Sequence, residues 1–293
     1  MPALTDLHLK DSIPDDSDGP STYPDVDLPC LRLLRISSGV GPLTIVLRHI
    51  TFPHTAKLKL TCRENSSIRV DFSNFLSVLA TIDKFLSSLV IRSLSLRTWT
   101  TNLEFYLWTT TFIQGCFPTR SLISESQLQL VLTWPSLQPH NHVKALTCAF
   151  DAMSLPFLTQ LQISTFNDCI DSKTWAKTFG RLPLLERVCV QCYGNSFLEA
   201  LVYKEEAEKS TTAYRTLSFL KFRYIHLVSA DFFGPGSTSV DLLLDCLIER
   251  CERNAGVQLL HLDDCYNFSS HDVERLREID VIWDGMERIG SDI

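Results

Sequence analysis

A short apolar phrase recurs along the chain at a nearly constant interval. Leu-Pro-x-Leu-x-x-[Leu/Val]-x-[Ile/Val] fits residues 155–163 and residues 182–190, whose starts lie 27 residues apart (182 − 155). Residues 1–9 and 28–36 fit a close variant of it, again 27 apart (28 − 1), and residues 52–60 follow after 24 (52 − 28). Weaker copies without the proline occupy 88–96, 140–148, 214–222 and 254–262. Such spacing predicts a chain built from similar units.

The phrase L-x-x-L-x-L has a physical interpretation. Leucines at alternate positions lie on one face of a strand, and one short strand cannot bury that face alone. Parallel strands that stack side by side can bury it, with a helix or loop returning the chain behind them. We therefore predict an α/β fold over residues 1–293. Its form would be a degenerate leucine-rich-repeat solenoid with a curved parallel sheet on the concave side and helices and loops on the convex side.

Several return segments have helical periodicity. Residues 71–89, 171–182 and 239–254 place apolar side chains at helical spacing, and Ser239 is a suitable N-cap for the last of them. Residues 122–132 predict an extra strand, within a region from 97 to 150 whose repeat spacing is irregular. The acidic stretch 11–27, rich in proline and serine, predicts a mobile loop, and we expect a ragged tail at 285–293.

The most complete copy spans residues 257–276. Val257, Leu260, Leu262, Cys265 and Phe268 fall in the order of the cysteine-containing leucine-rich repeat, L-x-x-L-x-L-x-x-C-x-x-[IL]. This predicts Cys265 as a small buried residue at a turn and not as a nucleophile. The pair Ser269 and Asp272 has the spacing of an N-terminal helix cap.

These phrases carry a resemblance to a known family. The copies at 28–36, 146–164 and 182–191, with the closing stretch 260–285, resemble the leucine-rich-repeat region of the F-box-like protein families of mushroom-forming fungi. The resemblance implies a protein-interaction module that recognises substrates for a ubiquitin ligase. No F-box, which docks a Skp-type adaptor, is visible, so that adaptor is an expected partner only if an F-box lies upstream.

Composition and charge narrow the class of partner. The net charge is −7, which disfavours a general nucleic-acid binder because such binding depends on neutralising phosphates. No run of 18 apolar residues predicts a membrane span. The 10 cysteines are scattered, and the N-terminal residues lack the pattern of a secretory signal. We therefore expect reduced thiols in the cytoplasm or nucleus and no secretion.

No motif predicts a catalytic, cofactor-binding or metal site. Cys189 and Cys192 form a C-x-x-C, but Cys189 falls inside a predicted strand and no second ligand pair is close in sequence. His140 and His142 follow a proline and predict a solvated loop. The stretch 234–241 lacks the Gly-Lys-[Ser/Thr] ending of a P-loop and predicts a turn that leads into a helix.

The repeat register predicts a basic surface. Residues flanking each L-x-L would point outward on the concave side, where leucine-rich-repeat proteins usually bind partners. Eight of these are basic and two, Asp6 and Asp263, are acidic, which gives +6 (8 − 2) in a chain of net charge −7. The expected binding residues are Lys10, Arg35, Lys57, Lys59, Arg97, Arg187, Lys221, Arg223 and His261.

Three functions follow from these patterns. The leading hypothesis is a non-enzymatic substrate receptor whose basic strip binds an acidic or phosphorylated segment of a partner protein. One alternative is a stand-alone repeat protein without a ubiquitin function, in which the basic residues only keep the strands soluble. The other is a hydrolase, which would need a deep pocket with converging, pKa-perturbed residues.

Overall fold

The chain divides into two compact units. The computed structural model describes residues 4–11, 23–64, 72–111, 120–135, 139–165, 170–191, 195–202, 219, 221–232, 239–277 and 279–288. The first unit is Met1–Phe112 with Cys116–Leu155, and the second is Ile113–Gly115 with Pro156–Ile293. Each is described by itself, so the prediction of one repeat domain over 1–293 stays a prediction.

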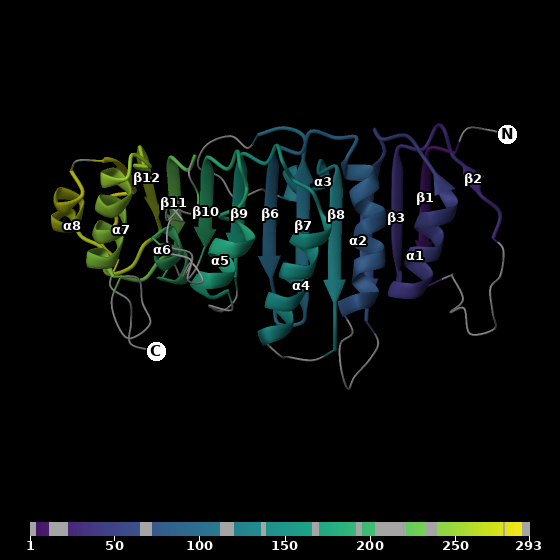
Figure 1. Ribbon diagram of the computed structural model, residues 1–293, viewed down its shortest axis with the longest axis horizontal. Helices are drawn as coiled ribbons and strands as arrows, with labels where there is room; N and C mark the ends of the chain where they lie inside the picture. The colour runs from purple at the N-terminus through teal and green to yellow at the C-terminus, as the bar shows by residue number, and fades with distance from the viewer. Residues whose placement is uncertain are drawn as a thin grey trace, which may run out of the picture. The chain divides into compact units, whose positions relative to one another are not determined.

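The first unit is a sheet with helices across one face (Figure 1). Its strands, in hydrogen-bonded order, are β1 (Asp6–Lys10), β3 (Leu33–Gly39), β5 (Lys57–Arg63), β8 (Leu128–Thr133), β7 (Asn102–Trp108) and β6 (Ser93–Thr98). Its helices are α1 (Val40–His49), α2 (Phe72–Leu86), α3 (Arg120–Ser124) and α4 (Pro139–Ala152). A short parallel pair, β2 (Val26–Asp27) with β4 (Ile50–Thr51), completes it.

Alternation of apolar and polar residues decides which face of these strands is buried. Leu34 pairs with Leu58 and Ile36 with Leu60 in the parallel register, and all four are at most 1% exposed. Residues between them point to the opposite face, because side chains alternate along a strand. The expected strands of the copies at 1–9, 28–36, 52–60 and 88–96, and the extra strand in 122–132, are confirmed.

The order of strands in the first unit departs from a simple repeat stack. β7 is antiparallel to both β6 and β8, and β8 lies beside β5. The expectation of parallel strands alone is therefore wrong for this region. The physical reason is local: β6 and β7 are joined by the turn at Trp99–Thr101, where the Trp99 N–H donates to the Asn102 carbonyl, and a turn this tight connects antiparallel strands.

The second unit has its strands in chain order and entirely parallel (Figure 1, green to yellow). They are β9 (Gln160–Ser164), β10 (Arg187–Gln191), β11 (Tyr224–Val228), β12 (Leu259–Asp263) and β13 (Asp280–Trp283). The helices are α5 (Ser172–Thr178), α6 (Asn195–Leu201), α7 (Val240–Glu252) and α8 (Ser270–Arg275). The α/β class predicted from the sequence is confirmed.

Helix starts in the second unit follow the sequence signals. Asp171 caps α5 by accepting from the Thr174 N–H, and Ser239 caps α7 by accepting from the Leu242 N–H. At α8, Ser269 and Asp272 form a reciprocal capping box. The predicted caps at Ser239 and Ser269 are confirmed, and each satisfies a backbone donor that the helix itself leaves free.

Two of the weaker copies were assigned wrongly. Residues 140–148 lie in α4, because Leu146, Ala149, Phe150 and Met153 are buried at helical spacing. In the copy at 214–222, the described residues Phe219, Lys221 and Phe222 precede the strand. The Phe222 N–H donates to the Phe219 carbonyl at 3.1 Å, which makes a turn.

The true strand in that region is β11. Ile225 and Leu227 are its buried residues, and they pair with Val188 and Val190 of β10. Phe219 and Phe222 are both buried, so this stretch has the apolar residues that a strand would have. They belong instead to a turn. In the part of the chain that is described, no helix has the length and apolarity needed to cross a bilayer. Most of the predicted loop at 11–27 and part of the tail at 285–293 lie outside the described residues.

Candidate functional site

The candidate sites lie on the strand face opposite the buried leucines, here called the open face. In the first unit it consists of Asp6, His8, Lys10, Leu33, Arg35, Ser37, Lys57, Lys59, Thr61, Arg63, Gln129, Val131, Thr133, Glu104, Tyr106 and Arg97. The predicted residues Lys10, Arg35, Lys57, Lys59 and Arg97 all lie on it. Arg63 and Glu104, which the repeat phrase did not include, lie there as well.

Three cations form a cluster on β3 and β5, here called the basic ladder: Arg35, Lys57 and Lys59. Arg35 is directly opposite Lys59, and Lys57 lies two residues before Lys59 on the same face. Arg35 is exposed and both lysines are half-buried. Among the described residues, none of the three has a carboxylate within ion-pair distance. The ladder therefore holds uncompensated positive charge.

The electrostatics of Lys59 reflect this crowding. Burial lowers the pKa of the Lys59 ammonium, and the charges of Arg35 and Lys57 lower it further. Like charges opposite one another on a sheet destabilise the free protein. An anion bound to the ladder would remove that repulsion.

The basic residues around the ladder are differently engaged. Arg63 donates to Asp11 at 3.0 Å and to Ser37 Oγ at 2.9 Å. Arg97 is opposite Glu104 in the antiparallel register, and its guanidinium lies 5.7 Å from the ring centre of Tyr106. The Tyr106 hydroxyl in turn donates to Glu104 at 2.7 Å. Arg97 therefore belongs to a polar cluster with its own acid and is not part of the basic ladder.

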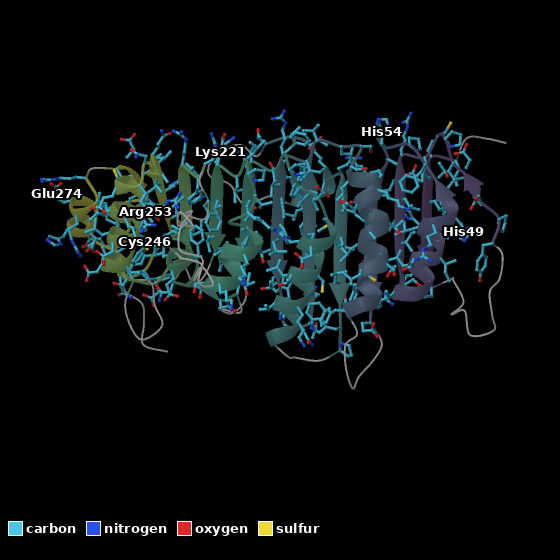
Figure 2. The ribbon with its side chains drawn as sticks, viewed as in Figure 1. His49, His54, Lys221, Cys246, Arg253 and Glu274 are labelled. Carbon is cyan, nitrogen blue, oxygen red and sulfur yellow. The ribbon has the colours of Figure 1, made fainter. Side chains whose placement is uncertain are left out.

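The second unit brings together fewer of the predicted residues. Arg187 and His261 lie on its open face, on β10 and β12. Lys221, labelled in Figure 2, and Arg223 are exposed but precede β11. The prediction that Lys221 and Arg223 belong to the strand face is wrong, because the register of that copy is shifted by five residues, from Leu220 and Phe222 to Ile225 and Leu227.

A hydrogen-bonded cluster occupies the open face of β10, β11 and β12, here called the histidine cluster: Cys189, Tyr224, His226, His261 and Asp263. His226 Nε2 lies 2.9 Å from one oxygen of Asp263, and His261 Nε2 lies 3.1 Å from the other. Cys189 Sγ lies 3.4 Å from His226 Nδ1, and the Tyr224 hydroxyl lies 3.2 Å from His261 Nδ1. The two imidazole rings stack, with centres 4.3 Å apart.

The parallel register explains why these residues meet. Cys189 is opposite His226, and His226 is opposite His261, so three successive strands place them in one row. Asp263 follows two residues after His261 on the same face and reaches back to both rings. The His226 side chain is 4% exposed, whereas that of Asp263 is 34% exposed. The cluster is therefore buried at its centre and open to solvent at its carboxylate.

Cys189, His226 and Asp263 form a hydrogen-bonded line of a thiol, an imidazole base and a carboxylate that orients the imidazole. Such a line would suit nucleophilic catalysis if the thiol ionised readily. Burial and the charge of Asp263 instead raise the pKa of the Cys189 thiol. Burial and then the neighbouring His261 lower the pKa of His226, against the opposing effect of Asp263. At neutral pH the thiol stays protonated and the ring neutral, which is the wrong charge state for attack.

The repeat register placed His261 and Asp263 on the outward strand face, and Cys189 fell inside a predicted strand, but no site was predicted from them. The shifted register of the copy at 214–222 left out Tyr224 and His226. The available signal was the alternation in residues 224–228, where Ile225 and Leu227 alternate with Tyr224 and His226. That alternation places His226 on the same strand face as His261. The neighbouring strands β11 and β12 bring these two polar residues together.

Other candidate motifs have structural roles. His142 is buried in α4, its ring contacts Trp134, and its Nε2 contacts the Trp99 carbonyl, so the predicted solvated loop is wrong. Pro139, the first residue of α4, is a favoured start for a helix. Residues 233–238 lie outside the described residues, and Ser239 after them caps α7.

Among the described residues, two of the surface pockets are lined mainly by apolar residues of the helices and their connections. The larger, about 470 Å³, lies between α7 and α8 and is lined by residues such as Leu247, Ile248 and Leu276. The other lies against α1 and α2, with Leu47 and Phe85 in its wall. Neither includes a residue of the histidine cluster, so neither supplies the converging perturbed groups that a hydrolase would need.

The cysteine of the copy at 257–276, Cys265, is protected from reaction because it lies in the core. Cys265 is fully buried at the turn after β12, and burial raises the pKa of its thiol to about 12. Cys62 and Cys246 are buried as well, and burial raises the pKa of each to about 12. The predicted position of Cys265 as a small buried residue is confirmed.

Alkylation of the native protein should therefore be selective. We expect iodoacetamide to modify the exposed Cys30 and Cys251 while Cys62, Cys246 and Cys265 react only after denaturation, because the thiolate is the reactive form and needs access to solvent. Peptide mass spectrometry of protein labelled with and without denaturant measures this. Native labelling of Cys265 at the rate of Cys251 would contradict the assigned packing.

Comparisons with known proteins add no relative. The chain matches no protein-family model, no curated protein and no solved structure.

Proposed function

We propose that the chain is a leucine-rich-repeat-like binding protein whose basic ladder holds an acidic or phosphorylated segment of a partner protein. The observation that carries the proposal is the set of Arg35, Lys57 and Lys59 in register without a described acidic partner. An extended anionic segment lying across β3 and β5 would place carboxylates or phosphates against all three. Arginine binds such groups by donating two parallel hydrogen bonds to them, and the lysines add point charges.

A repeat architecture, as proposed here, would favour a binding function over an enzymatic one. Strands stacked in register present a broad face rather than a closed cavity. The order β1, β3, β5 and the order β9 to β13 give such faces. The resemblance to F-box-like proteins supplies a setting for this binding, the selection of substrates for ubiquitin transfer. A stand-alone binding protein would use the same face, because the ladder needs no adaptor.

Charge reversal of the ladder tests the proposal. We expect the double variant Lys57→Glu/Lys59→Glu to bind extended peptides bearing several glutamates or phosphoserines about 10- to 100-fold more weakly than the unmodified chain, because attraction becomes repulsion at two contacts. Fluorescence anisotropy with labelled peptides at constant ionic strength measures this. Comparison of the glutamate and phosphoserine peptides shows which anion the ladder prefers.

The chain offers a charge-matched control. Lys221→Glu/Arg223→Glu makes the same change of net charge at exposed positions outside the strand face. We expect this variant to keep the affinity within about twofold, because these positions take no part in the proposed contacts with the peptide and the effect of distant exposed charges is reduced by salt. Equal losses in both double variants would show that only overall charge matters and would contradict the proposal.

A further inference from the structure

We propose that the histidine cluster is a binding site for a divalent transition-metal ion of the zinc type. The proposed ligands are His226 Nε2, His261 Nε2 and a carboxylate oxygen of Asp263. Their ligand atoms all lie within 4.8 Å of one another. Two imidazoles with one carboxylate are a ligand set that zinc and related ions accept, with further coordination positions left for water or a partner group.

The remaining members of the cluster support this assignment. In protein metal sites the second nitrogen of a ligating histidine is usually held by a hydrogen-bonding partner, which fixes the ring and its tautomer. Here Tyr224 Oη holds His261 Nδ1 and Cys189 Sγ holds His226 Nδ1. Both rings thus point their Nε2 atoms toward the same carboxylate while their Nδ1 atoms are anchored on the other side.

Without a metal, the cluster is a closed hydrogen-bonded network. With a proton on each Nε2, both rings donate to Asp263, and the Cys189 thiol and Tyr224 hydroxyl can donate to the Nδ1 atoms. With a metal, each ring stays neutral and carries its proton on Nδ1 instead. The ion then replaces two hydrogen bonds at Asp263, and the number of protons on the rings is unchanged.

The geometry requires a rearrangement on binding. Ligand atoms around a tetrahedral ion lie about 3.3 Å apart, from bond lengths near 2.0 Å. The present ligand atoms lie within 4.8 Å of one another, and the two nitrogens contact different oxygens of Asp263, at 2.9 and 3.1 Å. The two rings, now 10° from parallel, must tilt toward a common point. The half-exposed carboxylate of Asp263 gives an ion a path from solvent.

Zinc titration of the full chain, freed of metal with a chelator, tests the site. We expect one saturable equivalent of Zn²⁺ by calorimetry. Asp263→Asn and His261→Gln, which keep side-chain shape or polarity, should each weaken binding about 100-fold or more. Tyr224→Phe removes only an anchoring hydrogen bond and should weaken it about 10- to 100-fold. His8→Gln, a histidine on the open face of the first unit, should leave the affinity unchanged.

Two results would overturn the proposal. One is the absence of saturable binding to the unmodified chain at millimolar Zn²⁺. The other is unchanged affinity in Asp263→Asn and His261→Gln, which would place the zinc on cysteines elsewhere. Co²⁺ substitution of the unmodified chain separates these cases without any variant, because the proposed ligands are nitrogen and oxygen. A thiolate-to-cobalt charge-transfer band would assign the ion to cysteines and contradict the site.

Discussion

Replacing Arg250 with alanine should cost the protein about 3 kcal/mol of unfolding free energy, from lost charge-assisted hydrogen bonds and the cavity left behind. Arg250 belongs to α7 and is fully buried. Its guanidinium donates to the Leu201 carbonyl at 3.2 Å and to the Phe219 carbonyl at 2.7 Å, and lies 5.6 Å from the ring centre of Phe222. Burial lowers its pKa to about 10, so it stays charged at neutral pH.

The hydrogen bond from Arg250 to the Phe219 carbonyl stabilises the turn that precedes β11. Phe219 has a positive φ of 61°, which is strained for a residue with a bulky side chain. Arg250 holds the carbonyl of this residue and so links α7 to the turn that precedes β11. Urea denaturation of Arg250→Ala and Arg250→Met separates the causes, because methionine restores packing but not the hydrogen bonds.

Arg253, labelled in Figure 2, provides the control for this prediction. It follows α7 as its C-cap and pairs with Glu249, and both side chains are partly exposed. We expect Arg253→Ala to cost less than about 1 kcal/mol, as exposed ion pairs usually do. If Arg250→Ala destabilised the protein no more than Arg253→Ala, the assigned role of Arg250 would be wrong.

Phe197→Ala should have an effect of similar or larger size, a loss of about 3–5 kcal/mol. Phe197 of α6 is fully buried, and its ring centre lies 5.0 Å from that of Trp175, 6.3 Å from that of Phe219 and 6.0 Å from that of Phe222. Its removal leaves a cavity between these three neighbouring rings. Urea denaturation measures the loss.

Phe157→Ala is the matched control, because it makes the same chemical change at a side chain that is 49% exposed. We expect a change within about 0.5 kcal/mol there. Equal effects at both positions would contradict the packing of the aromatic cluster. Since Phe197 and Arg250 share Phe219 and Phe222 as neighbours, their combined effect should differ from the sum of the two.

The same neighbourhood shows what sequence periodicity could and could not predict. At β9 and β10 the apolar phrase gave the strands correctly, because Leu161 and Ile163, like Val188 and Val190, are buried with polar residues between them. Before β11 two buried phenylalanines belong to a turn, and their contacts with Phe197 and Arg250 are non-local. No periodicity in the sequence contains those contacts.

The two candidate sites likewise differ in how far the sequence could predict them. Arg35, Lys57 and Lys59 were predicted because they lie next to regular strand leucines in copies with the expected spacing. The histidine cluster was not predicted as one site, because its members are far apart in the chain: Cys189 and Asp263 each lie 37 residues from His226. Their meeting depends on a strand register that one misassigned copy had shifted.

The antiparallel direction of β7 could not be predicted from its apolar pattern. Its inward residues Leu103, Phe105 and Leu107 stand at alternate positions, as in the parallel strands, although Tyr106 and Trp108 on its other face are buried too. Alternation predicts a strand but not its direction, because both kinds of sheet bury alternate side chains. The direction came from the short connection between β6 and β7, and connection length is a better guide to it than the apolar pattern.

Zero-length cross-linking tests the central claim, binding at the basic ladder, most directly. A carbodiimide joins a carboxylate of a bound glutamate-rich peptide to a lysine amine that it touches, and mass spectrometry identifies that lysine. The account predicts cross-links at Lys57 and Lys59, and few at the exposed Lys84 and Lys144 of α2 and α4. Cross-links concentrated on the helical lysines, with Lys57 and Lys59 unmodified, would contradict it.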